Sequence, residues 1–288
     1  MDNIIRLHID LRDQIYRHGD YHAFRISDPK PRQIHKASVR DRLLHHAVHR
    51  LLYPLFDKIF ISDSFSCRLD KGTHAALNRF RDLARKTGRN HTRTVWVLKC
   101  DIRKFFANVD QTILLKQLFK RIPDDDIRRL LVEIVRSFNS GRSGVGIPLG
   151  NLTSQLFANI YLNELDQFVK QSLRFPNYIR YADDFVFLSP YRNELLAILP
   201  IVSDYLQSDL CLTMHPAKII LKTFASGVDF LGWTHFSDHR VLRKTTEWRM
   251  LKRVAEHHSR AIIRSYLGLL SHGNAIKLSK TVNNTITL

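Results

Sequence analysis

Residues Asn177–Ser189 read NYIRYADDFVFLS and carry the strongest structural signal in the chain. Two short runs of apolar and β-branched residues flank a polar pair, Asp183 and Asp184, which predicts two strands joined in a β-hairpin. Adjacent carboxylates at the tip of an apolar hairpin are costly, because like charges held close together disfavour joint ionisation. A divalent cation removes that cost. The alternative is a plain polar β-turn, in which aspartate is common.

A third carboxylate follows a second buried strand. Residues Thr94–Ile102 (TVWVLKCDI) are rich in β-branched and aromatic side chains, so they predict a strand that brings Asp101 to its end. If the two strands present Asp101, Asp183 and Asp184 together, they can hold two Mg²⁺ ions about 4 Å apart, the arrangement for in-line phosphoryl transfer. Magnesium shares its oxygen ligands with substrate phosphates, so a few protein carboxylates suffice. We expect two Mg²⁺ ions as cofactors, with Mn²⁺ able to replace them.

The rest of the chain interleaves helices and strands without a regular period. Apolar residues at helical spacing predict helices over 38–56, 111–120, 124–138, 152–173 and 194–208. Residues 227–234 (GVDFLGWT) predict another short strand turn. The fold class is therefore α+β.

Composition points to a polyanionic partner. The chain has 288 residues, 44% of them hydrophobic, while glycine (11) and proline (9) are sparse, which excludes a disordered or collagen-like chain. Lys and Arg number 45 against 27 Asp and Glu, a net charge of +18. Such an excess favours binding to nucleic acid over its alternatives, solubility by charge alone or binding to acidic membranes. Two basic arms, 79–104 and 240–288, flank a more balanced and apolar centre.

Other sequence features restrict the cellular setting. Three cysteines without a CxxC pair give neither a disulfide framework nor a zinc ribbon. No apolar run approaches the roughly 20 residues of a membrane span, and the N-terminus lacks a signal-peptide core. We expect a cytoplasmic protein without membrane contact. His45, His46 and His49 share one predicted helix, and we interpret them as helix-surface or template-side residues rather than zinc ligands.

A series of motifs runs along almost the whole chain in a fixed order. They are DPKPRQIHKASVRDRLLHHAV (28–48), SFSCRLDKGTHAA (64–76), LKCDIRKFFANVD (98–110), GIPLGNLTSQLFANIYLNELD (146–166), YADD (181–184), LTMHPAKI (212–219) and FLGW (230–233). This series resembles the fingers, palm and primer-grip motifs of reverse transcriptases. The resemblance implies a right-hand polymerase fold, with the N-terminal region and fingers in 1–95, a palm with fingers-derived helices in 96–240 and a short, basic helical thumb in 241–288. It also implies an RNA-directed DNA polymerase that takes a template RNA, a DNA or RNA primer and dNTPs.

One motif departs from the common family pattern. Most group II intron, retron and retroviral enzymes carry a QGxxxSP-type pocket motif, whereas residues 149–155 read LGNLTSQ. This variant is similar to the reverse transcriptases of diversity-generating retroelements, which copy a template RNA with frequent errors at adenines and pass the cDNA into a variable gene. Those enzymes work with a small basic accessory protein that forms a ring, so the resemblance implies such a partner. Two alternatives are a related reverse transcriptase of phage defence and an inactive, nucleic-acid-binding polymerase fold.

The resemblance also assigns roles to single residues. Asp101, Asp183 and Asp184 match the catalytic, metal-binding triad, and Ile102 beside Asp101 joins the metal site. The residues assigned to the incoming dNTP are Lys30, Arg32, Phe106, Leu149, Gly150, Gln155 and Lys218. The ring of Phe106 matches a steric gate against a ribose 2′-hydroxyl, with Phe105 as the alternative. Arg32 and Lys30 match contacts to the triphosphate, for which the forked donors of arginine are well suited.

The remaining assignments concern the base pair and the nucleic-acid strands. Leu149 and Gly150 match the pocket beside the nascent base pair, where a leucine leaves discrimination to shape alone; the alternative for Leu149 is plain core. Gln155 is expected to contact the template, and Lys218 to act as general acid for pyrophosphate release unless it is merely solvated. The primer grip comprises Phe230, Leu231, Gly232 and Trp233, and the thumb residues assigned to nucleic acid are Arg249, Lys252 and Arg253.

Overall fold

A computed structural model describes residues 2–27, 31–257 and 259–284. Its α-helices are α1 (Asp2–Arg12), α2 (Val39–Asp57), α3 (Thr73–Thr87), α4 (Phe105–Asn108), α5 (Gln111–Phe119), α6 (Asp125–Arg136), α7 (Leu152–Gln167), α8 (Arg192–Leu210), α9 (Lys244–His257), α10 (Arg260–Leu270) and α11 (Ile276–Asn284). Its strands are β1 (His22–Ile26), β2 (Arg32–Lys36), β3 (Ser64–Phe65), β4 (Trp96–Asp101), β5 (Tyr178–Tyr181), β6 (Asp184–Ser189), β7 (Ile220–Thr223), β8 (Val228–Phe230), β9 (Trp233–His235) and β10 (Arg240–Leu242). A π-helical turn, η1, spans Phe168–Ser172, and 3₁₀ turns cover Pro216–Lys218 and Phe224–Ser226.

A five-stranded sheet forms the centre of the molecule, in the order β3-β5-β6-β4-β7. The predicted hairpin is confirmed: β5 and β6 pair in antiparallel register with Tyr181 opposite Asp184, which leaves Ala182 and Asp183 as the turn. The strand predicted around residues 94–102 is confirmed as β4, which pairs with β6 on one side and β7 on the other. The mixed helix and sheet architecture confirms the predicted α+β class.

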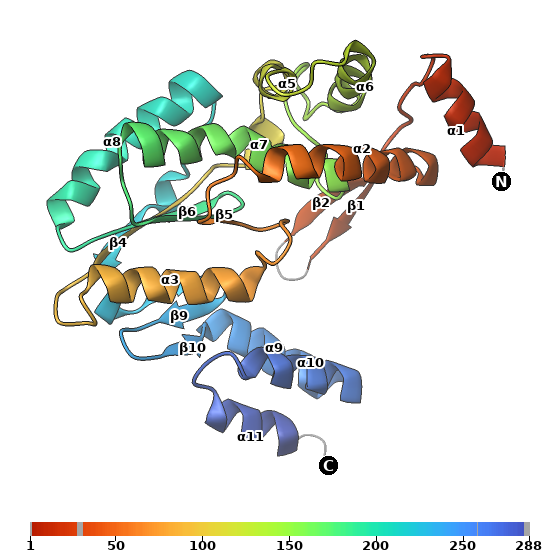
Figure 1. The fold of residues 1–288 in the computed structure, drawn as a ribbon. Helices are drawn as coiled ribbons and strands as arrows, with labels where there is room; N and C mark the ends of the chain where they lie inside the picture. The colour runs from red at the N-terminus through yellow and green to blue at the C-terminus, as the bar shows by residue number, and fades with distance from the viewer. Residues whose placement is uncertain (1, 28–30, 258, 285–288) are drawn as a thin grey trace.

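Both faces of this sheet are covered. In β6, Phe185 and Phe187 belong to the apolar core beneath α2, α5, α7 and α8, whereas Val186 and Leu188 belong to a second core on the face that α3 covers. Figure 1 shows α2, α7 and α8 on one side of the sheet and α3 on the other. Successive strand residues point to opposite faces, so both sets of side chains are buried, and the polar residues of β6, Asp184 and Ser189, lie at its two ends.

The C-terminal part forms a separate lobe in Figure 1, below α3. It consists of the three-stranded sheet β8-β9-β10 followed by α9, α10 and α11. Trp233, Met250 and Ile263 extend the second core into this lobe, where they join residues of α3. The boundaries at 95/96 and 240/241 stay a prediction.

Three details differ from or lie beyond the sequence predictions. The helix expected over 152–173 is regular only to Gln167 and continues as the π turn η1. The surface assignment of His45 is wrong: the residue is 2% exposed, and its ring contacts His18 Nε2 at 3.0 Å and Thr153 Oγ1 at 2.5 Å. A helix position that looks polar becomes buried when tertiary partners supply its hydrogen bonds. Lys30 lies outside the described residues.

Candidate active site

The three predicted carboxylates meet at one end of the central sheet. Asp101 is the last residue of β4 and lies directly opposite Asp184, the first residue of β6. Asp183 occupies the adjoining turn. Residues opposite each other in an antiparallel pair have Cβ atoms about 5 Å apart, so strand register alone brings Asp101 and Asp184 together.

A buried ion pair holds the turn that carries Asp183. Arg180 is completely buried and donates from Nε and Nη2 to the two oxygens of Asp166 at 2.8 and 2.6 Å. Its Nη1 also donates to the carbonyl of Ala182 at 3.0 Å, which fixes the turn from below. Ala182 has φ +52°, a left-handed conformation that costs a non-glycine residue about 1–2 kcal/mol. The Arg180–Asp166 pair was not predicted from the sequence, although Asp166 closes one of the quoted motifs.

Two lysines supply positive charge at the carboxylates. Lys218 Nζ donates to Asp101 Oδ1 at 2.6 Å, and Lys99 Nζ lies 3.7 Å from Asp184 Oδ1. Lys99 was not predicted, but it lies two residues before Asp101 on β4 and therefore on the same face of the strand. Burial, with smaller contributions from Asp184 and Asp101, raises the pKa of Asp183 to about 6. Three carboxylates therefore share the site with two lysines, and burial makes the ionised form of Asp183 costly.

This donor set fits a divalent cation. The oxygens are carboxylates, the ligand type that Mg²⁺ prefers, and the raised pKa of Asp183 reflects burial among like charges that bound cations would offset. Within residues 2–27, 31–257 and 259–284, no three histidine, cysteine or acidic side chains are grouped closely enough to hold a metal ion by themselves. An open arrangement suits Mg²⁺, which completes its shell with water and substrate phosphates.

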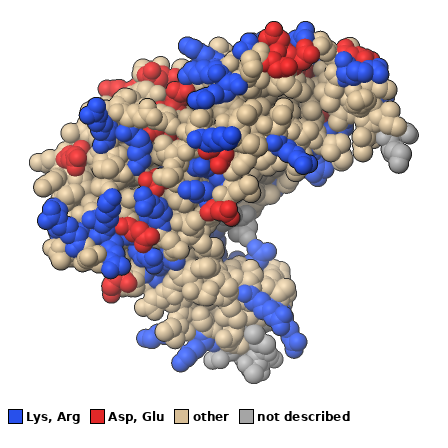
Figure 2. All heavy atoms as spheres, viewed as in Figure 1, with Lys and Arg blue, Asp and Glu red and all other residues tan. Residues whose placement is uncertain are grey.

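A cleft of about 670 Å³ opens beside Asp101 and Asp184, between the sheet and the C-terminal lobe. Figure 2 shows the molecule hollowed where the body overhangs that lobe. The predicted residues that line it are Arg32, Asp101, Asp184, Lys218, Leu231, Gly232 and Arg249. The lining residues that the sequence did not reveal include Lys99, Asp229, Arg243, Thr246 and Tyr266. The cleft therefore joins the carboxylates with cationic side chains from β2, the 3₁₀ turn Pro216–Lys218 and α9.

The four predicted primer-grip residues divide between the cleft and the core. Leu231 and Gly232 form a two-residue turn with φ +48° and +87°, between paired residues Phe230 and Trp233. Two positive φ values mark a type I′ turn, which suits a tight hairpin. The turn residues line the cleft, while Phe230 and Trp233 are at most 1% exposed and anchor the hairpin in the second core.

The predicted pocket motif, residues 149–155, is hydrogen-bonded to strand β2. His35 N donates to the Leu149 carbonyl at 2.8 Å, and Asn151 Nδ2 donates to the His35 carbonyl at 2.7 Å. Gly150 has φ +118°, and a Cβ there would lie 2.6 Å from Ile34 Cγ2, so only glycine allows this close approach. These contacts fix the strand that begins with Arg32.

The other predicted residues, Asp183 among them, do not line the cleft. Phe105 is 2% exposed and Phe106 is half-buried, and both belong to the short helix α4. Leu149 is half-buried and Gln155 is exposed on the first turn of α7. Ile102 is buried and bridges to Met214. Among the thumb residues that do not line the cleft, Lys252 lies 3.7 Å from Glu256, and Arg253 is the neighbouring basic residue on α9.

A family model described as reverse transcriptase (RNA-dependent DNA polymerase) matches residues 27–235, which include the carboxylates and the β8–β9 hairpin. The chain belongs to the reverse transcriptase family. Members of this family are RNA-directed DNA polymerases, and they generally depend on divalent metal ions.

Curated relatives agree with this membership. Protein YkfC of Escherichia coli (strain K12) is 24% identical over 284 residues, which cover 85% of this chain and 72% of YkfC. The group II intron-encoded protein LtrA of Lactococcus lactis subsp. cremoris is 28% identical over 136 residues, which cover 46% of this chain but only 22% of LtrA.

Solved structures show the same fold at low identity. An apo telomerase from Candida tropicalis truncated from its C-terminal domain superposes with a TM-score of 0.59 at 13% identity, covering 84% of this chain and 60% of the telomerase. A telomerase from Candida albicans, in complex with a TWJ fragment of telomeric RNA, gives 0.55 at 13% identity over 90% and 52% of the two chains. These likenesses confirm the right-hand polymerase fold. In the described part of the chain, no helix is long and apolar enough to cross a membrane.

Proposed function

We propose that this reverse transcriptase copies a template RNA into cDNA by extending a DNA or RNA primer with dNTPs. One observation carries the proposal: Asp101 and Asp184 lie opposite each other beside Asp183, at the wall of a basic cleft of about 670 Å³. Bound Mg²⁺ or Mn²⁺ ions would supply the charge that activates a primer 3′-hydroxyl and holds the leaving pyrophosphate. Asp101, Asp183 and Asp184, with the backbone at Ile102, would hold these ions.

The side chains around the cleft supply the remaining functions. Arg32 reaches the cleft from β2 and would bind the triphosphate of the incoming nucleotide. Lys218, held at Asp101, would donate a proton to the departing pyrophosphate. The Leu231–Gly232 turn would support the primer end, because its open backbone lets a strand approach closely. Phe106 is half-buried, unlike the buried Phe105, and its ring would act as the steric gate against a ribose 2′-hydroxyl.

The triad assignment is tested by primer extension on a defined RNA with Mg²⁺. We expect Asp101→Asn and Asp183→Asn to stop dNTP incorporation but to bind RNA nearly as tightly as wild type, because basic side chains elsewhere supply most of the affinity. Extension at the wild-type rate by either variant would overturn the assignment. Absence of extension by folded wild-type protein on several templates would favour the alternative of an inactive nucleic-acid-binding fold.

We propose further that the enzyme serves a diversity-generating retroelement and is error-prone at template adenines. The support is the LGNLTSQ sequence of residues 149–155, whose half-buried Leu149 has no hydrogen-bonding side chain to offer the nascent pair. The shape of an apolar pocket alone discriminates between a correct and an incorrect substrate by only about 1–3 kcal/mol. A small basic accessory protein that forms a ring would complete the assembly.

Sequencing of cDNA made on an adenine-rich RNA tests this second proposal, with and without the accessory protein. We expect Leu149→Gln to lower misincorporation opposite adenine, since one new polar contact is worth about 1 kcal/mol, or several-fold in error rate. The double variant with Gln155→Pro completes the common QGxxxSP pattern. Equal adenine error rates in all three proteins, at similar activity, would rule out this pocket as the source of the bias, and accurate copying by wild type would favour the phage-defence alternative.

A further inference from the structure

A second cavity lies in the helical layer, remote from the polymerase cleft. It has a volume of about 440 Å³, is open to solvent on one side, and is lined by the C-terminal end of α2, by α5, and by α7 with its π turn. None of its lining residues lines the cleft of Asp101 and Asp184. Small-molecule sites are concave and commonly occupy 300–1,000 Å³, so the cavity is large enough to hold a ligand.

One wall of the cavity is a ladder of side-chain amides. Asn163, Gln167 and Gln171 follow each other at intervals of four residues along α7 and η1, and all three line the cavity. Gln171 Nε2 donates to Gln167 Oε1 at 2.6 Å, and Gln167 Nε2 lies 3.3 Å from Asn163 Oδ1. These bonds fix the orientation of each amide in advance. A ligand that meets this wall would lose little affinity to ordering of the side chains.

The facing wall holds a buried carbonyl without a partner. Gln117 on α5 is 5% exposed and lines the cavity; its Nε2 donates to the Tyr161 carbonyl at 3.4 Å, but its Oε1 has no hydrogen bond to any described residue. A buried polar atom without a partner costs free energy that a bound N–H group would restore. Gln117 therefore has one acceptor left over at this wall.

Charge and shape narrow the class of ligand. Phe56 and Ile59 line the cavity with apolar surface, the kind of surface that packs against the face of a planar ring. At the rim, Lys120 is paired with Glu164 at 2.9 Å, whereas exposed Arg121 makes no ion pair with any residue in the described ranges. Paired amides recognise the edge of a nucleobase, and an arginine at the rim recognises a phosphate.

We propose that this cavity binds a nucleotide, with the base between the amide ladder and Gln117 and the phosphate at Arg121. The same chemistry has two sources: a free ribonucleoside monophosphate, or an unpaired nucleotide that projects from a folded RNA. This site is separate from the polymerase cleft and does not require the proposed polymerase activity.

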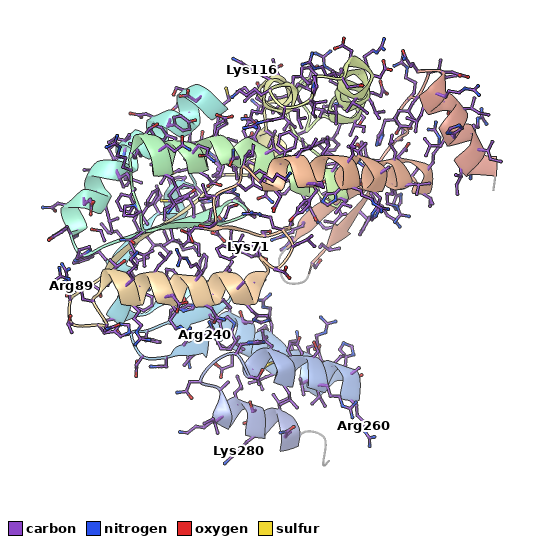
Figure 3. The ribbon with its side chains drawn as sticks, in the orientation of Figure 1. Lys71, Arg89, Lys116, Arg240, Arg260 and Lys280 are labelled. Carbon is purple, nitrogen blue, oxygen red and sulfur yellow. The ribbon has the colours of Figure 1, made fainter. Side chains whose placement is uncertain are left out.

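The first experiment uses the full chain with EDTA, which removes divalent ions from the cleft. Binding of 5′-AMP, GMP, CMP and UMP is measured by calorimetry. At least one is expected to bind in a 1:1 ratio, and Gln117→Leu and Arg121→Gln should each weaken it tenfold or more. Lys116→Ala is the matched control: it lies on the same helix α5, extends outward from the body in Figure 3 and does not line the cavity, so affinity should change less than twofold.

Thermal unfolding separates recognition from a structural role of Gln117. Leucine has a similar volume and removes the unpartnered carbonyl, so Gln117→Leu should keep or raise the Tm while binding is lost. A fall in Tm by several degrees together with lost binding would assign Gln117 to packing and would overturn its role as a ligand contact.

The second experiment distinguishes the two sources. A hairpin RNA with one bulged nucleotide is compared with the fully paired hairpin. If the bulge raises affinity at least fivefold in wild type but not in Gln117→Leu, the ligand belongs to RNA. If a mononucleotide binds but the two hairpins bind alike, the ligand is a free nucleotide. If neither a mononucleotide nor the bulge binds preferentially in wild type, the cavity holds only water and the proposal is wrong.

Discussion

At the scale of single residues, Asp183 has the clearest thermodynamic consequence. Its pKa is about 6 in the folded chain, against a usual value of 3.8, because the carboxyl is buried near Asp184 and Asp101. The folded state therefore binds a proton that the unfolded state has released, and folding loses stability as the pH rises from about 4 to 6. Above pH 6 the whole penalty is present, up to about 3 kcal/mol.

Asp183→Asn should therefore stabilise the metal-free protein at pH 7–8 by no more than about 3 kcal/mol, and the gain should vanish below pH 4. Urea unfolding in EDTA between pH 4 and 8 measures the difference. Asp20→Asn is the control, because Asp20 is exposed and its substitution should give a difference near zero at every pH. A gain that stays constant with pH would show that packing rather than ionisation is the cause.

The sequence predicted the three carboxylates because each follows or precedes an apolar strand, a local pattern. It did not predict Asp229, whose place at the cleft depends on which strands become neighbours. His45 illustrates the same limit, since its burial depends on contacts with His18 and Thr153, 27 and 108 residues away.

At the scale of elements, the β5–β6 hairpin depends on a buried ion pair. Arg180 and Asp166 are both completely buried, with side-chain exposure of 0%, and Arg180 also donates a hydrogen bond to the carbonyl of Ala182 in the turn. Removal of one partner leaves a buried charge uncompensated, which typically costs 3–5 kcal/mol. The sheet and the geometry of the active-site turn therefore rest on the same contact.

Asp166→Asn should lower the free energy of unfolding by about 3 kcal/mol or more. It should also reduce the rate of dNTP incorporation at temperatures where the variant stays folded, since the turn loses its support. Urea unfolding and primer extension provide the two measurements. Asp82→Asn, which breaks the exposed pair with Arg81, should cost less than about 1 kcal/mol and leave the rate unchanged. A folded Asp166→Asn protein with full activity would contradict the support that Arg180 gives to the turn.

Element prediction succeeded where periodicity was local. The hairpin, β4 and the helix α2 follow from apolar spacing, and α2 begins where Ser38 accepts a hydrogen bond from Asp41 N. The end of α7 at Gln167 could not be predicted from apolar spacing, because the chain there keeps its helical spacing while the hydrogen bonding changes to a π turn. The pairing of β2 with the Leu149–Asn151 segment also joins residues more than 110 positions apart, which no window of sequence reveals.

At the scale of the whole molecule, the cleft exists because the C-terminal lobe packs beside the sheet. Met250 and Tyr266, from α9 and α10, line the cleft together with Asp101 and Asp184. The net charge of +18 predicted a polyanionic partner but could not place it, since basic side chains also gather at the far end of α3. Figure 3 labels Arg89 there, away from the lobe that carries Arg260 and Lys280.

The salt dependence of RNA binding distinguishes these two basic regions. Each phosphate contact by Lys or Arg contributes about 0.7–0.9 to the slope of log K against log salt concentration. Combined substitution of Arg249, Lys252 and Arg253 by alanine should therefore reduce the slope by at most about 2–3. Most of the change should come from Arg249, which lines the cleft, and least from Lys252, which is paired with Glu256.

The matched control replaces Arg85, Lys86 and Arg89, an equal number of charges at the far end of α3. Fluorescence anisotropy with an RNA–DNA duplex from 50 to about 300 mM salt gives both slopes, a range in which such contacts lose most of their affinity. A larger loss of slope in the control than in the α9 variant would place the duplex along α3 and not in the cleft. The expected result, a larger loss in the α9 variant, would put the bound strands between the sheet and the C-terminal lobe, within reach of the three carboxylates.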